Sequence, residues 1–244
     1  MPGRRTALVM AAAGGAGVFF ALPRMAEFFA PTLTFEPLPG IDGFRQLAGG
    51  AVSRGNPALV GIDQADARLS DRSVCAHLFT APKPVNHVPI AYFSDARCVY
   101  CRVLSPLLHD LEASEPIAIT WHELPLLGPA SRRAAEAALA AKRQGAYTFF
   151  HDRLMGTPFL PNTAYIRQLA SDAGIDADQL LRDMQADGVA EDIARTASLA
   201  RRFGVYGTPA LVVGRTLVVG SVDERRLRRL IEIESNMTAP APCS

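Results

Sequence analysis

The chain has 244 residues, 49% of them hydrophobic, and its 25 basic and 24 acidic side chains nearly cancel. This length and composition predict one globular domain with an ample core, or one such domain with an extension. A net charge of +1 gives no basic footprint for DNA or RNA, so we expect no nucleic-acid partner.

The first thirty residues differ in character from the rest of the chain. Two arginines precede an uncharged stretch over residues 6–22 that is rich in Ala, Val, Phe and Gly, which is typical of an export signal. The alanines that follow lack a small-x-small cleavage pattern, which favours an uncleaved anchor. Against an anchor, a helix over residues 6–22 spans only about 26 Å of a roughly 30 Å hydrocarbon core. We expect residues 1–30 to be a signal peptide or a signal anchor, with the cysteines outside the cytoplasm.

The first strong strand signal is the apolar run over residues 88–93, and a helical spacing of leucines follows it. Cys98 and Cys101 lie at this strand-to-helix junction. Unpaired N–H groups and the helix dipole at a helix N-terminus favour a thiolate, and the pKa of a cysteine there falls from about 8.5 to roughly 3.5–7.5. Arg97 should lower it further, and Asp95 should oppose that effect. We predict a redox pair in which Cys98 is the more exposed, attacking thiol and Cys101 the resolving one.

Other functions of a CxxC pair have weaker support in this sequence. A zinc site needs four ligands, whereas Cys75 and Cys243 are isolated and the five histidines show no paired spacing, so no metal site is expected. A structural disulfide over so short a loop would constrain the unfolded chain little. A Cu(I)-binding module remains an alternative because two thiolates suit a soft metal, although no Met-rich or His-rich tract supports it.

In an oxidising compartment, where disulfides persist, the remaining two cysteines could also form a disulfide. If Cys98 pairs with Cys101, the remaining option is a structural disulfide between Cys75 and Cys243. It would close a very long loop, which the loop-entropy model values at upwards of about 4 kcal/mol. The alternative is two unrelated thiols.

Downstream, one more strand precedes a helical region, and a hairpin and a last helix follow it. The strand covers residues 116–123, and the helices are expected over 131–144, 146–155, 163–173, 176–185 and 189–203. The hairpin strands are 210–213 and 216–219, and Asp223 begins the last helix. Pro106 should lie inside the helix after Cys98 and kink it, because the leucine stripe continues to Leu111.

This order of elements, with Cys98 and Cys101 at the first junction, resembles the thioredoxin fold carrying the helical insertion of the DsbA family. Residues 92–98, 127–131, 144–151 and 203–210 are similar to the family's active-site approach, its insertion and its loop before the hairpin. The resemblance covers roughly residues 84–234. It implies an α/β thioredoxin fold with an inserted all-helical subdomain, preceded by the N-terminal membrane anchor or signal segment. The expected divisions are 1–30 for the signal or anchor, 31–82 for an N-terminal extension, 83–234 for the thioredoxin domain with its insertion at about 126–203, and 235–244 for a tail.

The resemblance also implies a substrate-binding loop. In the family the loop before the hairpin faces the CxxC pair and contains a cis proline, here Pro209, so the backbone of Thr208 could pair with an extended substrate segment. Periodicity alone favours an ordinary trans turn. Residues 31–82 lie outside the resemblance and could be a docking or dimerisation arm, or a spacer from the membrane.

The implied function is that of a periplasmic protein thiol-disulfide oxidoreductase without a cofactor. Its substrates would be cysteine-containing exported proteins, with a membrane redox partner and inner-membrane attachment through residues 6–22 if that segment is retained. The leading hypothesis is an oxidase that introduces disulfides. Val99 and Tyr100 depart from the Pro-His of the family's best-known oxidases, and a tyrosine there is reminiscent of periplasmic isomerases. An isomerase or reductase kept reduced by a membrane partner is therefore the alternative, and the Cu(I)-binding module is a third.

Overall fold

The computed structural model describes residues 32–55, 71–237 and 242–243. The expected signal or anchor segment, residues 1–30, lies outside the described residues. Among the helices that are described, none combines the length and the apolar character that a membrane crossing requires. The fold below is that of the compact unit Thr34–Ser244.

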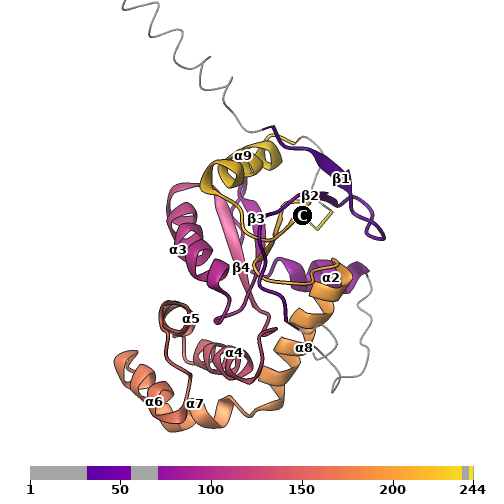
Figure 1. Ribbon diagram of the computed structural model, residues 1–244. Coiled ribbons are helices and arrows are strands. Elements are labelled where there is room, and N and C mark those ends of the chain that lie inside the picture. The colour runs from indigo at the N-terminus through magenta and orange to yellow at the C-terminus, as the bar shows by residue number, and fades with distance from the viewer. Residues whose placement is uncertain (1–31, 56–70, 238–241, 244) are drawn as a thin grey trace, which may run out of the picture. The chain divides into compact units, whose positions relative to one another are not determined.

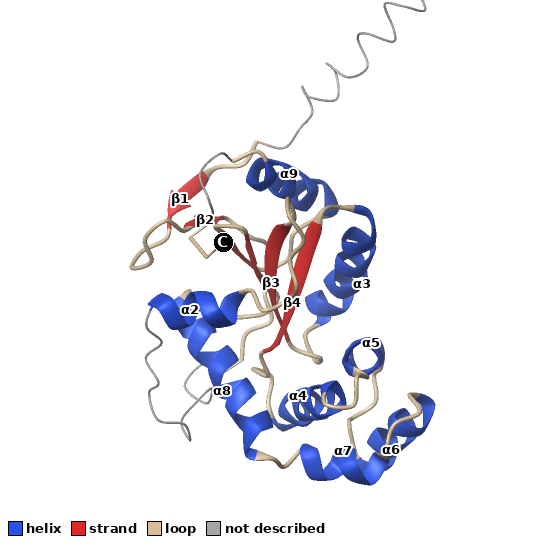
Figure 2. Ribbon diagram, turned by 180° about the vertical axis from the view of Figure 1, so that it is seen from behind, coloured by secondary structure: helices blue, strands red, loops and turns tan. Residues whose placement is uncertain are grey.

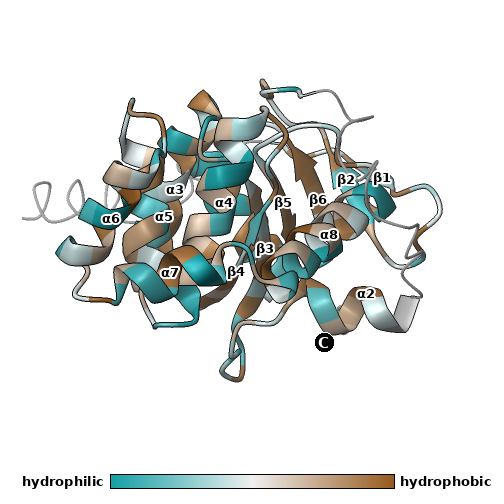
Figure 3. Ribbon diagram, turned by 90° about the horizontal axis from the view of Figure 1, so that it is seen from below, coloured by the Kyte–Doolittle hydropathy of each residue, from teal (hydrophilic) through white to brown (hydrophobic). Residues whose placement is uncertain are grey.

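A six-stranded sheet forms the centre of this unit, in the order β1-β2-β6-β5-β3-β4 (Figure 1). The strands are β1 (Phe35–Pro37), β2 (Arg45–Leu47), β3 (Val88–Ser94), β4 (Ile117–Glu123), β5 (Ala210–Val213) and β6 (Thr216–Val219). Central strand β3 runs parallel to β4 and antiparallel to β5. All seven β3 residues are buried, which explains why its sequence is a nearly continuous apolar run rather than an alternating one. Figure 3 shows the same hydrophobic character along β5 and β6.

Helices cover both faces of the sheet (Figure 2). They are α2 (Asp71–Leu78), α3 (Val99–Ser114), α4 (Pro129–Lys142), α5 (Tyr147–Gly156), α6 (Thr163–Asp172), α7 (Ala177–Asp183), α8 (Asp187–Arg202) and α9 (Glu224–Ser235). One face of β3 and β5 packs on α2 and the C-terminal half of α8. Helix α9 also contacts β3 and β5, and α3 contacts β4.

The helices between β4 and β5 build a second hydrophobic core of their own. Six buried alanines of α4 lie at its centre with residues of α5, α6, α7 and α8. Small side chains let helix axes approach closely, so an alanine-rich helix suits this position. Phe150, Ile166 and Leu180 fill the space around it and are fully buried.

The predicted order of strand, helix, strand, helical block, hairpin and helix is confirmed, and the fold is a mixed α/β thioredoxin-like one. The hairpin strands have the predicted bounds. Helix α3 continues past Pro106 to Ser114, as the leucine stripe indicated.

The described parts of residues 31–82 were predicted as an arm or spacer, and the structure differs. Strand β2 pairs in parallel with β6, and β1 pairs with β2, so this segment extends the main sheet. Arg45 fixes β2 there, since its guanidinium donates to Glu234 at 2.7 Å and to the Thr216 hydroxyl at 2.8 Å. Strands of three residues are too short to show an alternating pattern in the sequence.

Candidate active site

Cys98 and Cys101 both lie at the start of α3, as predicted. Cys98 is the N-cap residue with an extended backbone, and its Sγ accepts a hydrogen bond from the Cys101 N–H at 3.1 Å. Its own N–H donates to the Asp95 carbonyl at 2.9 Å. Cys101 lies on the buried face of the first helical turn, and both cysteines are free thiols. A sulfur at the N-cap can therefore be stabilised as an anion by a backbone donor and by the helix dipole.

The prediction that Cys98 is the more exposed thiol is wrong, because both cysteines are 0% exposed. Cys98 and Cys101 pack with Met155, and Tyr100 and Leu127 flank them. The local sequence around Cys98 cannot reveal this burial, since Met155 and Leu127 come from other parts of the chain.

The loop before the hairpin lies directly against Cys98. The peptide bond between Thr208 and Pro209 is cis. Cys98 Sγ lies 3.2 Å from the carbonyl oxygen of Thr208, to which the thiol donates when it is protonated, and Thr208 is fully buried. The structure therefore brings together all four residues predicted for the site: Cys98, Cys101, Thr208 and Pro209.

Sequence reasoning missed a further element of the site, which we call the strap (residues 49–55). Ser53 and Thr208 form an antiparallel bridge, with the Ser53 N–H donating to the Thr208 carbonyl at 2.8 Å and the Thr208 N–H donating to the Ser53 carbonyl at 3.0 Å. Before it along the chain, Gly50 donates to the Ser221 carbonyl at 2.8 Å, and Ser221 donates to the Ala51 carbonyl at 2.9 Å. The strap is thus hydrogen-bonded through Ser53 to the loop that faces Cys98.

The two thiols differ strongly in acidity. The pKa of Cys98 is lowered from its ordinary 9.0 to about 6, chiefly by a hydrogen bond from the Cys101 thiol, against the opposing effect of burial. The hydrogen bond from the Cys101 N–H and the nearby Ser53 and Thr208 side chains lower it further. The pKa of Cys101 is raised, first by burial and then by its interactions with Cys98. Cys98 is therefore mostly thiolate at neutral pH, and Cys101 stays protonated.

Asp95 was expected to oppose the Cys98 thiolate as a neighbouring charge, but the contacts of its carboxylate give it a structural role. Oδ1 accepts from the Arg97 N–H at 2.8 Å and the Ser131 hydroxyl at 2.7 Å, and Oδ2 accepts from the Leu126 and Leu127 N–H groups at 2.7 and 3.0 Å. Burial raises the pKa of Asp95, and these four bonds work against that rise. The side chain joins the loop before Cys98 to the segment that leads into α4.

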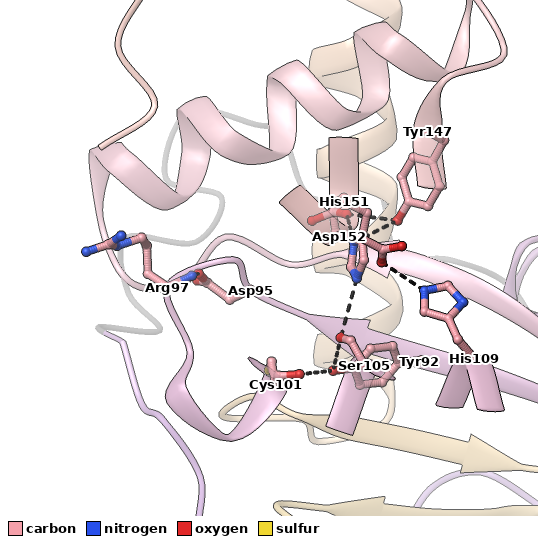
Figure 4. A network of polar contacts seen from close by, with 10 residues as sticks. Tyr92, Asp95, Arg97, Cys101, Ser105, His109, Tyr147, His151 and Asp152 are labelled. Atoms are coloured by element: carbon pink, nitrogen blue, oxygen red, sulfur yellow. Dashed lines mark hydrogen bonds and ion pairs between the residues drawn. The ribbon is translucent and has the colours of Figure 1, made fainter. Parts of the chain in front are cut away.

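A buried polar network extends from the start of α3 into α5 (Figure 4). The Tyr92 hydroxyl lies 3.4 Å from the Cys101 carbonyl and 3.1 Å from the Ser105 hydroxyl. Ser105 Oγ lies 3.4 Å from His151 Nε2, and His151 Nδ1 lies 2.8 Å from Glu123 Oε1. Burial raises the pKa of Tyr92, which keeps its hydroxyl neutral. Four buried polar side chains thus find partners in one another beneath the cysteine pair.

Cys75 and Cys243 form a disulfide in the structure, with an S–S distance of 2.00 Å across 168 residues of sequence. It joins α2 to the C-terminal segment. Within the described ranges, no cluster of three or more His, Cys, Asp or Glu residues is arranged to hold a metal ion.

Comparison with known proteins gives consistent matches. The model of a family described as a DSBA-like thioredoxin domain matches residues 89–232. A thioredoxin-like oxidoreductase from Silicibacter pomeroyi DSS-3 is 36% identical with a TM-score of 0.59, covering 65% of this chain and 94% of that one. The thiol-disulfide exchange protein alpha-DsbA2 from Wolbachia pipientis is 25% identical, also with a TM-score of 0.59, covering 67% of this chain and 96% of its own.

The curated relatives are longer proteins of another description. The Na(+)/H(+) antiporter NhaA 3 of Salinispora tropica is 30% identical over 129 residues, which make up 52% of this chain. The chain spans only about a fifth of that relative's length, 20%.

Proposed function

Since the chain belongs to the DSBA-like thioredoxin family and is a thiol-disulfide oxidoreductase, we propose that it is an exported oxidase that introduces disulfides into other proteins. The observation that carries this proposal is the unequal acidity of the two thiols, with the pKa of Cys98 at about 6 and that of Cys101 raised. A low thiolate pKa stabilises the reduced pair, which makes the oxidised pair the stronger oxidant.

The first step is attack on the enzyme's disulfide. A substrate thiolate attacks Cys98 Sγ, the bond between Cys98 and Cys101 breaks, and Cys101 leaves with the electron pair. Because the pKa of Cys101 is raised, that sulfur takes up a proton. The enzyme then carries the substrate on Cys98 as a mixed disulfide.

The second step releases the product. A second substrate thiolate attacks the substrate sulfur, and Cys98 leaves as a thiolate. The Cys101 N–H at 3.1 Å and the N-terminus of α3 stabilise that leaving group. The substrate loses two electrons and the cysteine pair gains them, so a membrane redox partner has to remove them before the next turnover.

An isomerase or reductase remains the second candidate, and one observation favours it. Val99 and Tyr100 differ from the oxidase dipeptide.

A redox titration of Cys98 and Cys101 against glutathione separates the two candidates. A potential near −120 mV supports the oxidase, and one near −270 mV contradicts it. A protein with Cys98→Ser provides the blank, and it should show no exchange activity. If it retains exchange activity, the proposed role of Cys98 fails.

Export to the periplasm is part of the proposal. It is supported by the character of residues 1–30 and by the disulfide between Cys75 and Cys243, a bond that persists in oxidising compartments. A structure 26% identical to this chain, with a TM-score of 0.58, is described as a periplasmic thioredoxin-like protein from Salmonella enterica serovar Typhimurium. Fractionation of cells expressing the full chain tests the location, and a salt and carbonate wash tests membrane attachment through residues 6–22. Recovery of the folded protein in the cytoplasm would contradict it.

A further inference from the structure

The strap pairs with the loop before the hairpin, which contains cis-Pro209, through the same backbone groups that a bound peptide substrate would use. A peptide bound beside Thr208 as an added strand would exchange two backbone hydrogen bonds with it. Ser53 already makes both of these bonds, at 2.8 and 3.0 Å. An external peptide and the strap therefore cannot occupy this edge at the same time.

Ser53 also reaches the reactive sulfur. Cys98 Sγ lies 3.2 Å from the carbonyl oxygen of Thr208, the residue with which Ser53 pairs, and the nearby Ser53 side chain helps to lower the pKa of that thiol. Serine has the shape of cysteine with oxygen in place of sulfur. In a mixed disulfide, the group next to Cys98 Sγ is the substrate's cysteine, and here that neighbour is a serine that cannot form the bond.

The side chains on either side of Ser53 are directed elsewhere. Val52 packs toward Gly207, where an added Cβ would lie 3.1 Å from the Val52 Cβ and 2.9 Å from the Ser53 carbonyl oxygen. The guanidinium of Arg54 lies 4.8 Å from the centre of the Tyr206 ring. This alternation is that of a strand, in which only every second side chain faces a given neighbour.

The backbone of the strap is closely seated at both ends as well. A Cβ on Gly49 would lie 2.0 Å from the Val219 carbonyl oxygen, and one on Gly55 would lie 1.8 Å from that of Leu126. Glycine allows such close approach because it has no side chain. The strap is therefore in close contact with its neighbours at both ends, and Ser53 is not placed by a single contact.

We propose that the strap is an internal pseudosubstrate, with Ser53 in the place of the substrate's cysteine. This inference rests on the proposed function, because the cysteine of a substrate would take the place of Ser53 beside Cys98. Because Gly207 has no side chain, it leaves room for the backbone of a substrate peptide at the place where the Ser53 carbonyl now lies. The strap has to separate from Thr208 before a protein substrate can react with Cys98.

A designed disulfide tests the position of Ser53. In a Cys101→Ser background, Ser53→Cys places a thiol where we expect the substrate's thiol. Glutathione disulfide is the oxidant: the Cys98 thiolate attacks it and releases one glutathione, and the new thiolate then displaces the second. The expected product is a bond between residues 53 and 98, mapped by mass spectrometry of non-reduced peptides.

Val52→Cys and Arg54→Cys in the same background are the matched controls. Both should remain glutathionylated or free, with at least about tenfold less cross-link than Ser53→Cys, because neighbouring strand residues face opposite ways. Equal cross-linking at all three positions, or none at 53 in a protein with unchanged circular dichroism, would overturn the proposal.

A second pair of variants tests whether the strap covers Cys98. Ser53→Pro removes the N–H that donates to Thr208, whereas Ser53→Ala keeps both backbone bonds. Loss of one such bond should raise the alkylation rate of Cys98 by iodoacetamide about fivefold in Ser53→Pro. Equal rates for Ser53→Pro and Ser53→Ala would contradict the inference.

The two proposals fail in different ways. Exchange activity, measured for both the unmodified chain and the Ser53→Pro chain so that the strap cannot mask it, tests the proposed function. If the chain exchanges disulfides but Ser53→Cys does not cross-link, only the pseudosubstrate is wrong. If the cross-link forms but neither the unmodified chain nor the Ser53→Pro chain exchanges disulfides, the proposed function is wrong.

Discussion

The acidity of Cys98 should make the stability of the reduced protein depend on pH, and Cys98→Ser should remove that dependence. Cys98 is an acid whose folded pKa, about 6, lies below its ordinary value of 9.0. Such a group stabilises the fold fully above the unfolded pKa, and the contribution is lost as pH falls through the folded pKa. The window for Cys98 therefore runs from pH 9 down to about pH 6.

The size of the effect follows from the two pKa values. A difference of three units corresponds to about 4 kcal/mol when both states are fully ionised. Between pH 5 and pH 8, linkage gives a gain of about 3 kcal/mol for the reduced wild-type protein. The serine in Cys98→Ser does not titrate, so the difference between the two proteins should grow by that amount.

Urea unfolding of both reduced proteins at pH 5, 6, 7 and 8 measures this difference. Other groups titrate in the same range, such as His122, whose pKa burial lowers to about 4, but they are present in both proteins and cancel. The reductant is kept mild enough to leave Cys75 joined to Cys243, which mass spectrometry verifies. Oxidised wild type, which lacks the thiolate, is the second control and should parallel Cys98→Ser. Parallel curves for reduced wild type and Cys98→Ser would refute the assigned acidity.

Three other substitutions test separate parts of the structure. Cys101→Ser should trap substrates on Cys98, visible as adducts on non-reducing gels that dithiothreitol removes; absence of adducts would contradict the two-step exchange. Asp95→Asn replaces one oxygen acceptor with an N–H₂ donor, which leaves at least one backbone N–H without its partner and should lower the free energy of unfolding by about 1–3 kcal/mol in urea. Cys75→Ser opens a loop of 168 residues and should lower it by about 2–5 kcal/mol under oxidising conditions. The same substitution should have no effect once wild type is fully reduced, and a loss that persists there would point to packing instead.

Much of the fold could be predicted because its signals are local. The apolar run of β3 and the turn at Gly214 each lie within a few residues, and the N-cap Asp223 accepts a hydrogen bond from the Arg226 N–H within one helical turn. The cysteine pair could be predicted for the same reason. Its place at a strand-to-helix junction puts Cys98 at the N-cap of the helix, and that position favours a low thiol pKa.

The parts that were missed depend on contacts between distant residues. Strand β2 is held by Arg45 and Glu234, and the strap is held by Thr208, so neither leaves a pattern in its own stretch of sequence. The burial of Cys98 follows from such contacts, which is why its exposure was predicted wrongly. The buried network through Ser105 and His151 was missed for the same reason, because isolated polar residues within helices normally indicate solvated faces.

The bridge between Ser53 and Thr208 also bears on how substrates compete for the site. An occupant on the same chain cannot diffuse away, and a short tether gives it an effective concentration in the millimolar range. A peptide that merely resembles the strap, at micromolar concentration, would be excluded by mass action. A peptide with a cysteine gains a covalent bond to Cys98 that Ser53 cannot make. Such a peptide could therefore displace the tethered strap, whereas a peptide of similar shape without a cysteine could not.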